Sequence, residues 1–232
     1  MNISASDNIV QISGLNSAEF LQGQITNDIN LLTHNDMLDS AICSVKGRVI
    51  AVFRILKAED SFYIFLNHSV AEKFVNHLEK YSVFYKTNIK IIDYLPKSIE
   101  IIPELTWKQN CIDRGFVDMN SSISESYTPH ELNYQNLELI NFKKGCFTGQ
   151  EVIARMHYRG KLKFGLAKYH IHEDSFLGEF EFVFNDNGKK IGQVVSCIKN
   201  IGLIAMKDKS CLMGKFFNKN SEEICFLNME ST

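Results

Sequence analysis

The sequence predicts an α+β protein, and two features of its 232 residues indicate this class. In the first half, segments with the alternating apolar pattern of strands enclose one amphipathic helical segment. In the second half, short strand-like runs follow one another and are separated by glycine, asparagine and aspartate. This second pattern is typical of a small barrel or sandwich.

The first half predicts an antiparallel sheet that is covered on one face by a helix. Residues 70–85 carry apolar side chains at helical spacing. A shorter helix is expected to begin near Asn16 or Ser17, because either residue can act as an N-cap. The expected strands of this half are 9–12, 38–45, 48–56, 61–66 and 89–92.

The second half begins after a weak and mixed pattern over residues 95–126, and a short helix is expected over 152–156. The sequence Asn-Asp-Asn-Gly at 185–188 is the strongest hairpin signal in the chain. The expected strands are 165–171, 179–184, 191–197, 201–206 and 223–227.

The composition is that of an ordinary soluble globular protein. Hydrophobic residues make up 45 %, charged residues make up 22 %, and the formal net charge is −2. This balance disfavours direct nucleic-acid binding, because such binding draws its affinity largely from phosphate neutralisation. No apolar run approaches the length of a membrane span, so no membrane partner is expected.

The six cysteines are expected to be reduced. None belongs to a C-x-x-C pair, and the N-terminus lacks the basic and apolar parts of a signal peptide, so we expect a cytoplasmic protein. Buried or half-buried thiols are predicted at Cys43, Cys111, Cys197, Cys211 and Cys225. The histidines form no recognisable ligand set, and no metal site is predicted.

The sixth cysteine, Cys146, lies in the segment that is the densest candidate for chemistry. Residues 144–151 read Lys-Gly-Cys-Phe-Thr-Gly-Gln-Glu. Glycines permit the backbone of a constrained turn, and adjacent cations or a following helix N-terminus make a thiol a better nucleophile or metal ligand. The alternative is a tight turn with solvated lysines and an inert, buried cysteine.

This segment, followed by Ala154-Arg155 and Tyr158-Arg159-Gly160, resembles the signature of the YgfZ family, relatives of the glycine-cleavage T-protein. Other blocks agree with the family in the same order, so that the resemblance covers most of residues 9–163. These blocks are 12–14 with 20–28, 44–48, 80–84, and 127–129 with Asn133.

The resemblance implies a fold. We expect a T-protein-like folate-binding core over 1–163, with a ferredoxin-like middle portion at about 45–106, and a small C-terminal β-barrel over 164–232. The stretch between Ile89 and Trp107 is shorter than in the family, so the ferredoxin-like portion is expected to be shortened.

The resemblance also implies a function. It predicts a folate-dependent accessory protein for the assembly or repair of iron–sulfur enzymes, including tRNA-thiolating ones, with reduced folate and iron–sulfur client proteins as partners. The cofactor would be tetrahydrofolate or a one-carbon-substituted folate. Catalytic roles are expected for Cys146 and Lys144. Folate contacts are expected from Trp107, Asp113, Asn27, Lys46, Arg48, Gln150, Glu151 and Arg155.

Several of these contacts have a chemical rationale in the side chains themselves. The amide of Gln150 and the carboxylate of Glu151 can pair with the amino-pyrimidinone edge of a pterin. The indole of Trp107, the only tryptophan, can stack on a pterin, although core packing is the alternative.

Two other functions remain open on the sequence. One is aminomethyl transfer, for which the T-protein uses an acidic residue in the hairpin that here reads Lys46-Gly47-Arg48. YgfZ proteins share this absence of a carboxylate, so aminomethyltransferase activity is not expected. The other is a non-catalytic module that docks a client protein or an RNA through its barrel, although the net charge of −2 disfavours the RNA.

Overall fold

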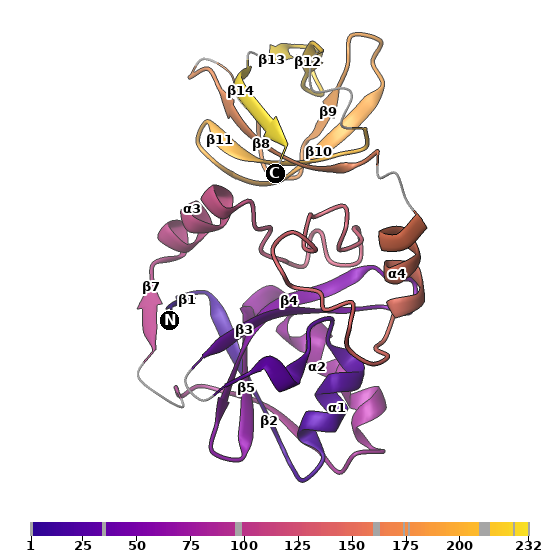
Figure 1. Cartoon of the computed structure of the whole chain (residues 1–232). Helices are drawn as coiled ribbons and strands as arrows, with labels where there is room; N and C mark the ends of the chain where they lie inside the picture. The colour runs from indigo at the N-terminus through magenta and orange to yellow at the C-terminus, as the bar shows by residue number, and fades with distance from the viewer. Residues whose placement is uncertain are drawn as a thin grey trace. The chain divides into compact units, whose positions relative to one another are not determined.

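The computed structural model describes residues 2–33, 36–95, 99–159, 163–173, 175, 177–208, 214–224 and 226–231. The predicted α+β class is confirmed (Figure 1). The chain forms two compact units. The first comprises Met1–Trp107, Met119–Pro129 and Gln135–Arg155, and the second comprises Lys108–Asp118, His130–Tyr134 and Met156–Thr232.

The first unit is built on a five-stranded antiparallel sheet in the order β3-β4-β5-β2-β6. Two helices, α1 (Ser17–Gln24) and α2 (His68–Ser82), pack on one face of it through a shared apolar core (Figure 1). This is the predicted sheet with a helix on one face. The strands are β2 (Asp7–Ser13), β3 (Met37–Cys43), β4 (Val49–Ala58), β5 (Ser61–Asn67) and β6 (Asn88–Ile92).

The opposite face of this sheet is also buried, which the sequence pattern did not reveal. Alternate residues of β4 belong to two different apolar clusters: Ile55 packs with the helices and Leu56 with the other face. The second cluster includes Ile3 of β1 (Asn2–Ser4), a strand that pairs in parallel with β7 (Glu100–Ile102). A strand buried on both faces loses the alternation of polar and apolar residues.

The second unit contains a seven-stranded antiparallel sheet that curls into a half-barrel (Figure 1). Its order is β13-β12-β9-β10-β11-β8-β14. The predicted 223–227 strand is two strands at opposite edges, and the predicted 179–184 strand shortens because Phe180 has φ 66°. The strands are β8 (Gly165–Ile171), β9 (Phe182–Phe184), β10 (Lys190–Ile198), β11 (Ile201–Met206), β12 (Phe216–Phe217), β13 (Glu223–Ile224) and β14 (Phe226–Ser231).

Two further helices flank the irregular middle of the chain. The helix α4 (Gln150–Arg159) contains the predicted 152–156 segment, whereas α3 (Glu104–Arg114) was not predicted. Only Cys111 and Ile112 of α3 are buried, so its sequence lacks the apolar stripe that would predict a helix. A short 3₁₀ turn, η1, spans Ile29–Leu31. In the part of the chain that the structure describes, no helix has both the length and the apolar character needed to cross a membrane.

Candidate functional site

The cysteine segment is a loop that leads directly into α4, and its thiol is exposed. Cys146 lies on the surface, whereas the next residue, Phe147, is buried and anchors the loop. Cys43 and Cys111 are buried and Cys197 is half-buried, as predicted. Cys211 and Cys225 lie outside the described residues. Among the cysteines that the structure describes, Cys146 is therefore the accessible one.

Lys144 fixes this loop to the end of α1. Its side chain is only 7 % exposed, and its Nζ donates hydrogen bonds to the backbone carbonyls of Gln22, Ile25 and Asn27 at 2.7, 2.7 and 2.8 Å. An ammonium group has three donor protons, and these three bonds use them all. This geometry supports a positioning role for Lys144, because none of its donors points to a ligand in this conformation.

The loop satisfies carbonyls that the end of a helix leaves without partners. Gln22 lies in the last turn of α1, and the neighbouring carbonyl of Gly23 accepts from the backbone N–H of Thr148 at 3.2 Å. A cation near a helix C-terminus is also favoured by the helix dipole. Burial lowers the pKa of the Lys144 ammonium to about 8. The cation is thus held in a desolvated place where carbonyl oxygens replace water.

The β3–β4 hairpin lies against the same loop. The Cα of Gly47, at the hairpin tip, would be 3.3 Å from a Cβ added at Gly149. That added atom would also approach the Ser44 carbonyl oxygen at 2.6 Å, and one added at Gly47 would approach Cβ of Val152 at 2.9 Å. The two glycines, both at positive φ, let the hairpin, the cysteine loop and the first turn of α4 meet.

The structure therefore brings several predicted ligand residues to one region of the first unit. Lys46, Glu151 and Arg155 are exposed and Gln150 is half-buried. Arg48 is half-buried, and its guanidinium donates to the Ser126 carbonyl at 2.8 Å.

Asn27 is a structural residue of the same region. Its Nδ2 donates to the carbonyls of Asp39 and Glu138 at 2.8 and 2.9 Å, and its Oδ1 accepts from the N–H of Asp28 at 2.9 Å. Both ends of the amide are thus bound to the backbone. The sequence did not indicate this role, because all three partners are backbone groups, and the carbonyls of Asp39 and Glu138 come close to Asn27 only in the folded chain.

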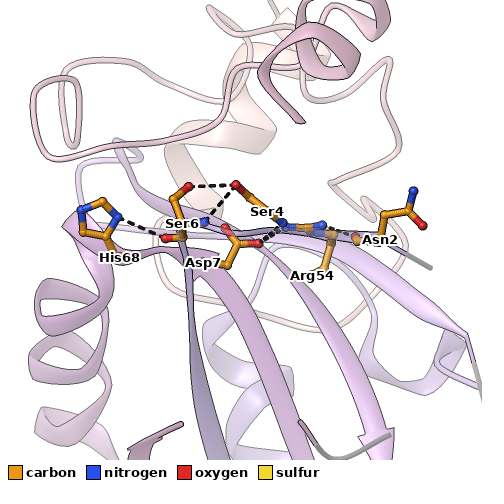
Figure 2. A network of polar contacts seen from close by, with 6 residues as sticks. All are labelled: Asn2, Ser4, Ser6, Asp7, Arg54 and His68. Atoms are coloured by element: carbon orange, nitrogen blue, oxygen red, sulfur yellow. Dashed lines mark hydrogen bonds and ion pairs between the residues drawn. The ribbon is translucent and has the colours of Figure 1, made fainter. Parts of the chain in front are cut away.

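Trp107 has a defined partner in the first unit. The Arg54 guanidinium carbon lies 3.9 Å from the centroid of its ring, the geometry of a cation–π contact. Arg54 is in turn held by the carboxylate of Asp7 and the carbonyl of Asn2 (Figure 2). The Asp7 side chain is 1 % exposed, and burial raises its pKa because the lost solvation outweighs the attraction of Arg54.

Asp113 lies in the second unit and has two partners there. Its carboxylate accepts from Nε2 of Gln109 at 3.0 Å and from Nζ of Lys168 at 2.9 Å. These hydrogen bonds, that from Gln109 first, lower the pKa of the exposed carboxyl. Asp113 and Trp107 both belong to α3, but six residues of helix turn them about 120° apart.

Among the described residues, no three histidine, cysteine, aspartate or glutamate side chains come together as metal ligands. The side chains beside the cysteine loop instead offer hydrogen-bonding and charged groups. A carboxylate and an amide, from Glu151 and Gln150, can pair with a pterin edge, while Lys46 and Arg155 can neutralise the glutamate tail. Gln150, Glu151 and Arg155 follow the cysteine loop in the sequence. Lys46 is close to the loop because the adjacent Gly47 contacts Gly149 and Val152.

Several known proteins are similar to this chain over most of its length. The chain is 26 % identical to an uncharacterized protein of Haemophilus influenzae, over 84 % of this chain and 83 % of that protein. It is 26 % identical to the tRNA-modifying protein YgfZ of Colwellia psychrerythraea, over 81 % and 77 % of the two chains. For the protein of that name in Escherichia coli the identity is 25 %, over 82 % and 78 %. No family model matches.

The fold also has a solved counterpart. The glycine cleavage system aminomethyltransferase T of Bartonella henselae superimposes with a TM-score of 0.70, over 97 % of this chain and 84 % of that chain, at 11 % sequence identity. This likeness establishes a T-protein-like fold, as predicted. The resemblance to the YgfZ proteins that the cysteine motif predicted is confirmed by relatives that match about four fifths of the chain.

Proposed function

We propose that this chain is a YgfZ-type accessory protein that supports the assembly or repair of iron–sulfur enzymes, tRNA-thiolating enzymes among them. The observation that carries the proposal is the exposed thiol of Cys146 on a loop clamped to α1 by buried Lys144. A structural cysteine is ordinarily buried, whereas a reactive one must be accessible and held in place. The names of the YgfZ relatives support the link to tRNA modification.

In this proposal the residues around Cys146 have separate tasks. Cys146 is the reactive group, and Lys144 positions the loop that carries it. A reduced folate, when bound, would supply a one-carbon carrier. Gln150 and Glu151 would hold its pterin edge, Lys46, Arg48 and Arg155 its glutamate tail, and Trp107 would stack on the ring system. The backbone carbonyl of Asn27 supports the loop by accepting a hydrogen bond from Lys144 Nζ.

The test of the thiol is complementation of a strain that lacks its own YgfZ protein. The Cys146→Ala variant should fail to restore iron–sulfur enzyme activity, while Cys197→Ala, which removes a half-buried thiol, should restore it. Equal melting temperatures of the two variants exclude a folding defect. Full restoration by Cys146→Ala would remove the cysteine from the mechanism.

The test of the cofactor is a titration of the purified protein with a reduced folate. Trp107 is the only tryptophan, so a change in its fluorescence reports on one place in the chain. We expect saturable quenching, and calorimetry on the Trp107→Phe variant should show weaker binding than on Lys90→Arg, a conservative change on β6. No quenching together with no heat would remove folate from the proposal.

Aminomethyl transfer is the activity of the structural neighbour, as its name states. In this chain the hairpin tip consists of Lys46, Gly47 and Arg48, so two cations stand where that reaction needs a carboxylate. We therefore expect no methylene-tetrahydrofolate from an aminomethyl donor. The proposal would have to be replaced if that product formed at a rate dependent on this protein.

A further inference from the structure

A separate pocket of about 330 Å³ lies in the curled sheet of the second unit. Its lining includes Phe184, Asp186, Gly188, Phe217, Lys219 and Ser221. None of these belongs to the cysteine loop or to the predicted folate contacts. Its volume is in the range of small-molecule sites, which begins at roughly 300 Å³.

Two turns of the same design frame this pocket. One follows β9 and begins at Asn185, and the other follows β12 and begins at Asn218. In each, the asparagine Oδ1 accepts the backbone N–H groups two and four residues further on, at 3.2 and 2.8 Å in the first turn and 2.9 and 3.1 Å in the second. Gly188 and Ser221 occupy matching positions with φ of 69° and 64°. The pocket thus lies between two turns of the same hydrogen-bonded conformation.

The floor of the pocket is aromatic. Phe184 and Phe217 are directly paired across β9 and β12, so their side chains lie on the same face of the sheet. Their neighbours Val183 and Phe216 are buried in the apolar core of the unit. Because side chains alternate along a strand, Phe184 and Phe217 face away from that core and toward the pocket.

The walls carry opposite charges at equivalent positions. Asp186 directly follows Asn185, and Lys219 directly follows Asn218. Because β9 and β12 are antiparallel, the two turns extend from the Phe184–Phe217 pair in opposite directions, so the two charges lie on opposite sides of that pair. Asp186 is exposed. Lys219 forms an ion pair of 2.8 Å with Glu181, with its own side chain 66 % exposed. Such a surface pair is weak and can be exchanged for a ligand's anion.

We propose that this pocket binds a planar heteroaromatic ring that has an amino-pyrimidinone edge and an anionic tail. The phenylalanine pair would stack on the ring. The Asp186 carboxylate would accept two N–H groups of the edge, and Lys219 would bind the anion. Guanine nucleotides and pterins both carry this chemistry. Adenine lacks it: beside its amino group, its ring nitrogen accepts a hydrogen bond, whereas the ring nitrogen of an amino-pyrimidinone edge donates one.

The test is a titration of the full-length, ¹⁵N-labelled protein with GMP, with folic acid, whose pterin is fully aromatic, and with AMP, followed by NMR. We expect saturable shifts of residues 184–188 and 217–221 with GMP, with the folate, or with both, and none with AMP. Shifts with only one of the two ligands identify the source of the ring. This readout is independent of Trp107 and Cys146, so it is separate from the test of the proposed function.

Variants then locate the contacts. Asp186→Asn should weaken binding about tenfold or more, the usual discrimination of a bidentate contact. Asp60→Asn, which removes an exposed carboxylate from the β4–β5 turn of the other unit, should leave it unchanged. Phe217→Leu should also weaken binding. The proposal fails if neither ligand gives saturable shifts at these residues, if AMP binds equally well, or if Asp186→Asn binds like Asp60→Asn.

Discussion

The guanidinium of Arg54 lies 3.9 Å above the ring of Trp107 and is held by the buried carboxylate of Asp7. The network continues through the first residues of the chain, where the N–H of Ser4 donates to Asp7 and Ser4 and Ser6 exchange a hydrogen bond (Figure 2). Trp107 is thus linked to the sheet of the first unit by a cation–π contact with Arg54 of β4. Its fluorescence should report on this network as well as on any ligand.

Replacement of Arg54 should show how much the network stabilises the unit. Arg54→Met leaves Asp7 buried without its cation, and breaking a buried pair in this way costs about 3–5 kcal/mol. Urea unfolding followed by Trp107 emission measures the loss. Lys90→Met, which removes an exposed cation from β6, is the control and should change the free energy of unfolding by less than about 0.5 kcal/mol. Equal losses in the two variants would contradict the assignment.

The clamp at Lys144 can be tested against its neighbour in the sequence. Lys144→Met leaves three backbone carbonyls without their donor and should lower the free energy of unfolding by about 3 kcal/mol. Lys143→Met removes an exposed lysine and should have little effect. The same pair should differ in the rate at which iodoacetamide alkylates Cys146, because only loss of the clamp releases the loop. An unchanged rate in Lys144→Met would mean that the loop does not depend on the clamp.

The two glycines of the cysteine loop should respond differently to substitution. An alanine at Gly149 meets the Ser44 carbonyl at 2.6 Å with φ at 84°, so Gly149→Ala should cost about 1–3 kcal/mol and displace the hairpin. A Cβ at Gly145 meets nothing within 4 Å, so Gly145→Ala should fold normally. Thermal unfolding of both variants measures the difference. A Gly145→Ala protein as unstable as Gly149→Ala would show that the loop is more crowded than this packing indicates.

Stability should depend on pH through His130. The residue is 2 % exposed, and burial, reinforced by nearby His157, lowers its pKa from 6.5 to about 4. Between these values the unfolded chain binds a proton that the folded chain does not, so the free energy of unfolding decreases as the pH falls from 6.5 to 4. The slope from one such proton is at most about 1.4 kcal/mol per pH unit.

Urea unfolding over pH 4 to 7.5 measures this slope. His130→Gln should flatten the curve below pH 6.5 and run parallel to the wild type above pH 7, whatever its absolute stability. A variant curve as steep as the wild type below pH 6.5 would assign the proton to another group.

Much of this fold was visible in the sequence because it rests on local patterns. The hairpin turn at 185–188, the strand 201–206 and the helix α2 each follow from spacing and turn residues. The helix α3 lacks an apolar stripe, yet it carries terminal signals that could have revealed it: Pro103 before its first residue and Gly115, at φ 70°, after its last.

The site was predicted less completely, and the reason is the nature of its contacts. The exposure of Cys146 followed from its glycine-flanked motif. The partners of Lys144 and Asn27 are backbone carbonyls, which are present at every residue and leave no signal in the side-chain sequence. Arg54 was missed because its partners, Asp7 and Trp107, are far from it in the chain.

The clamp at Lys144 also means that the cysteine loop can reach its native position only late in the synthesis of the chain. Its three carbonyl partners precede it by 117 to 122 residues. The ribosome therefore releases α1 long before it adds Lys144. Until then, the carbonyls of Gln22, Ile25 and Asn27 lack the donor that they have in the folded chain. Contacts of such long sequence separation slow folding, because the entropy of closing a long loop must be lost before they form. A chain that ends before residue 144 cannot close this end of α1, and a chain that presents an ordered Cys146 has already brought its first 27 residues to their native place.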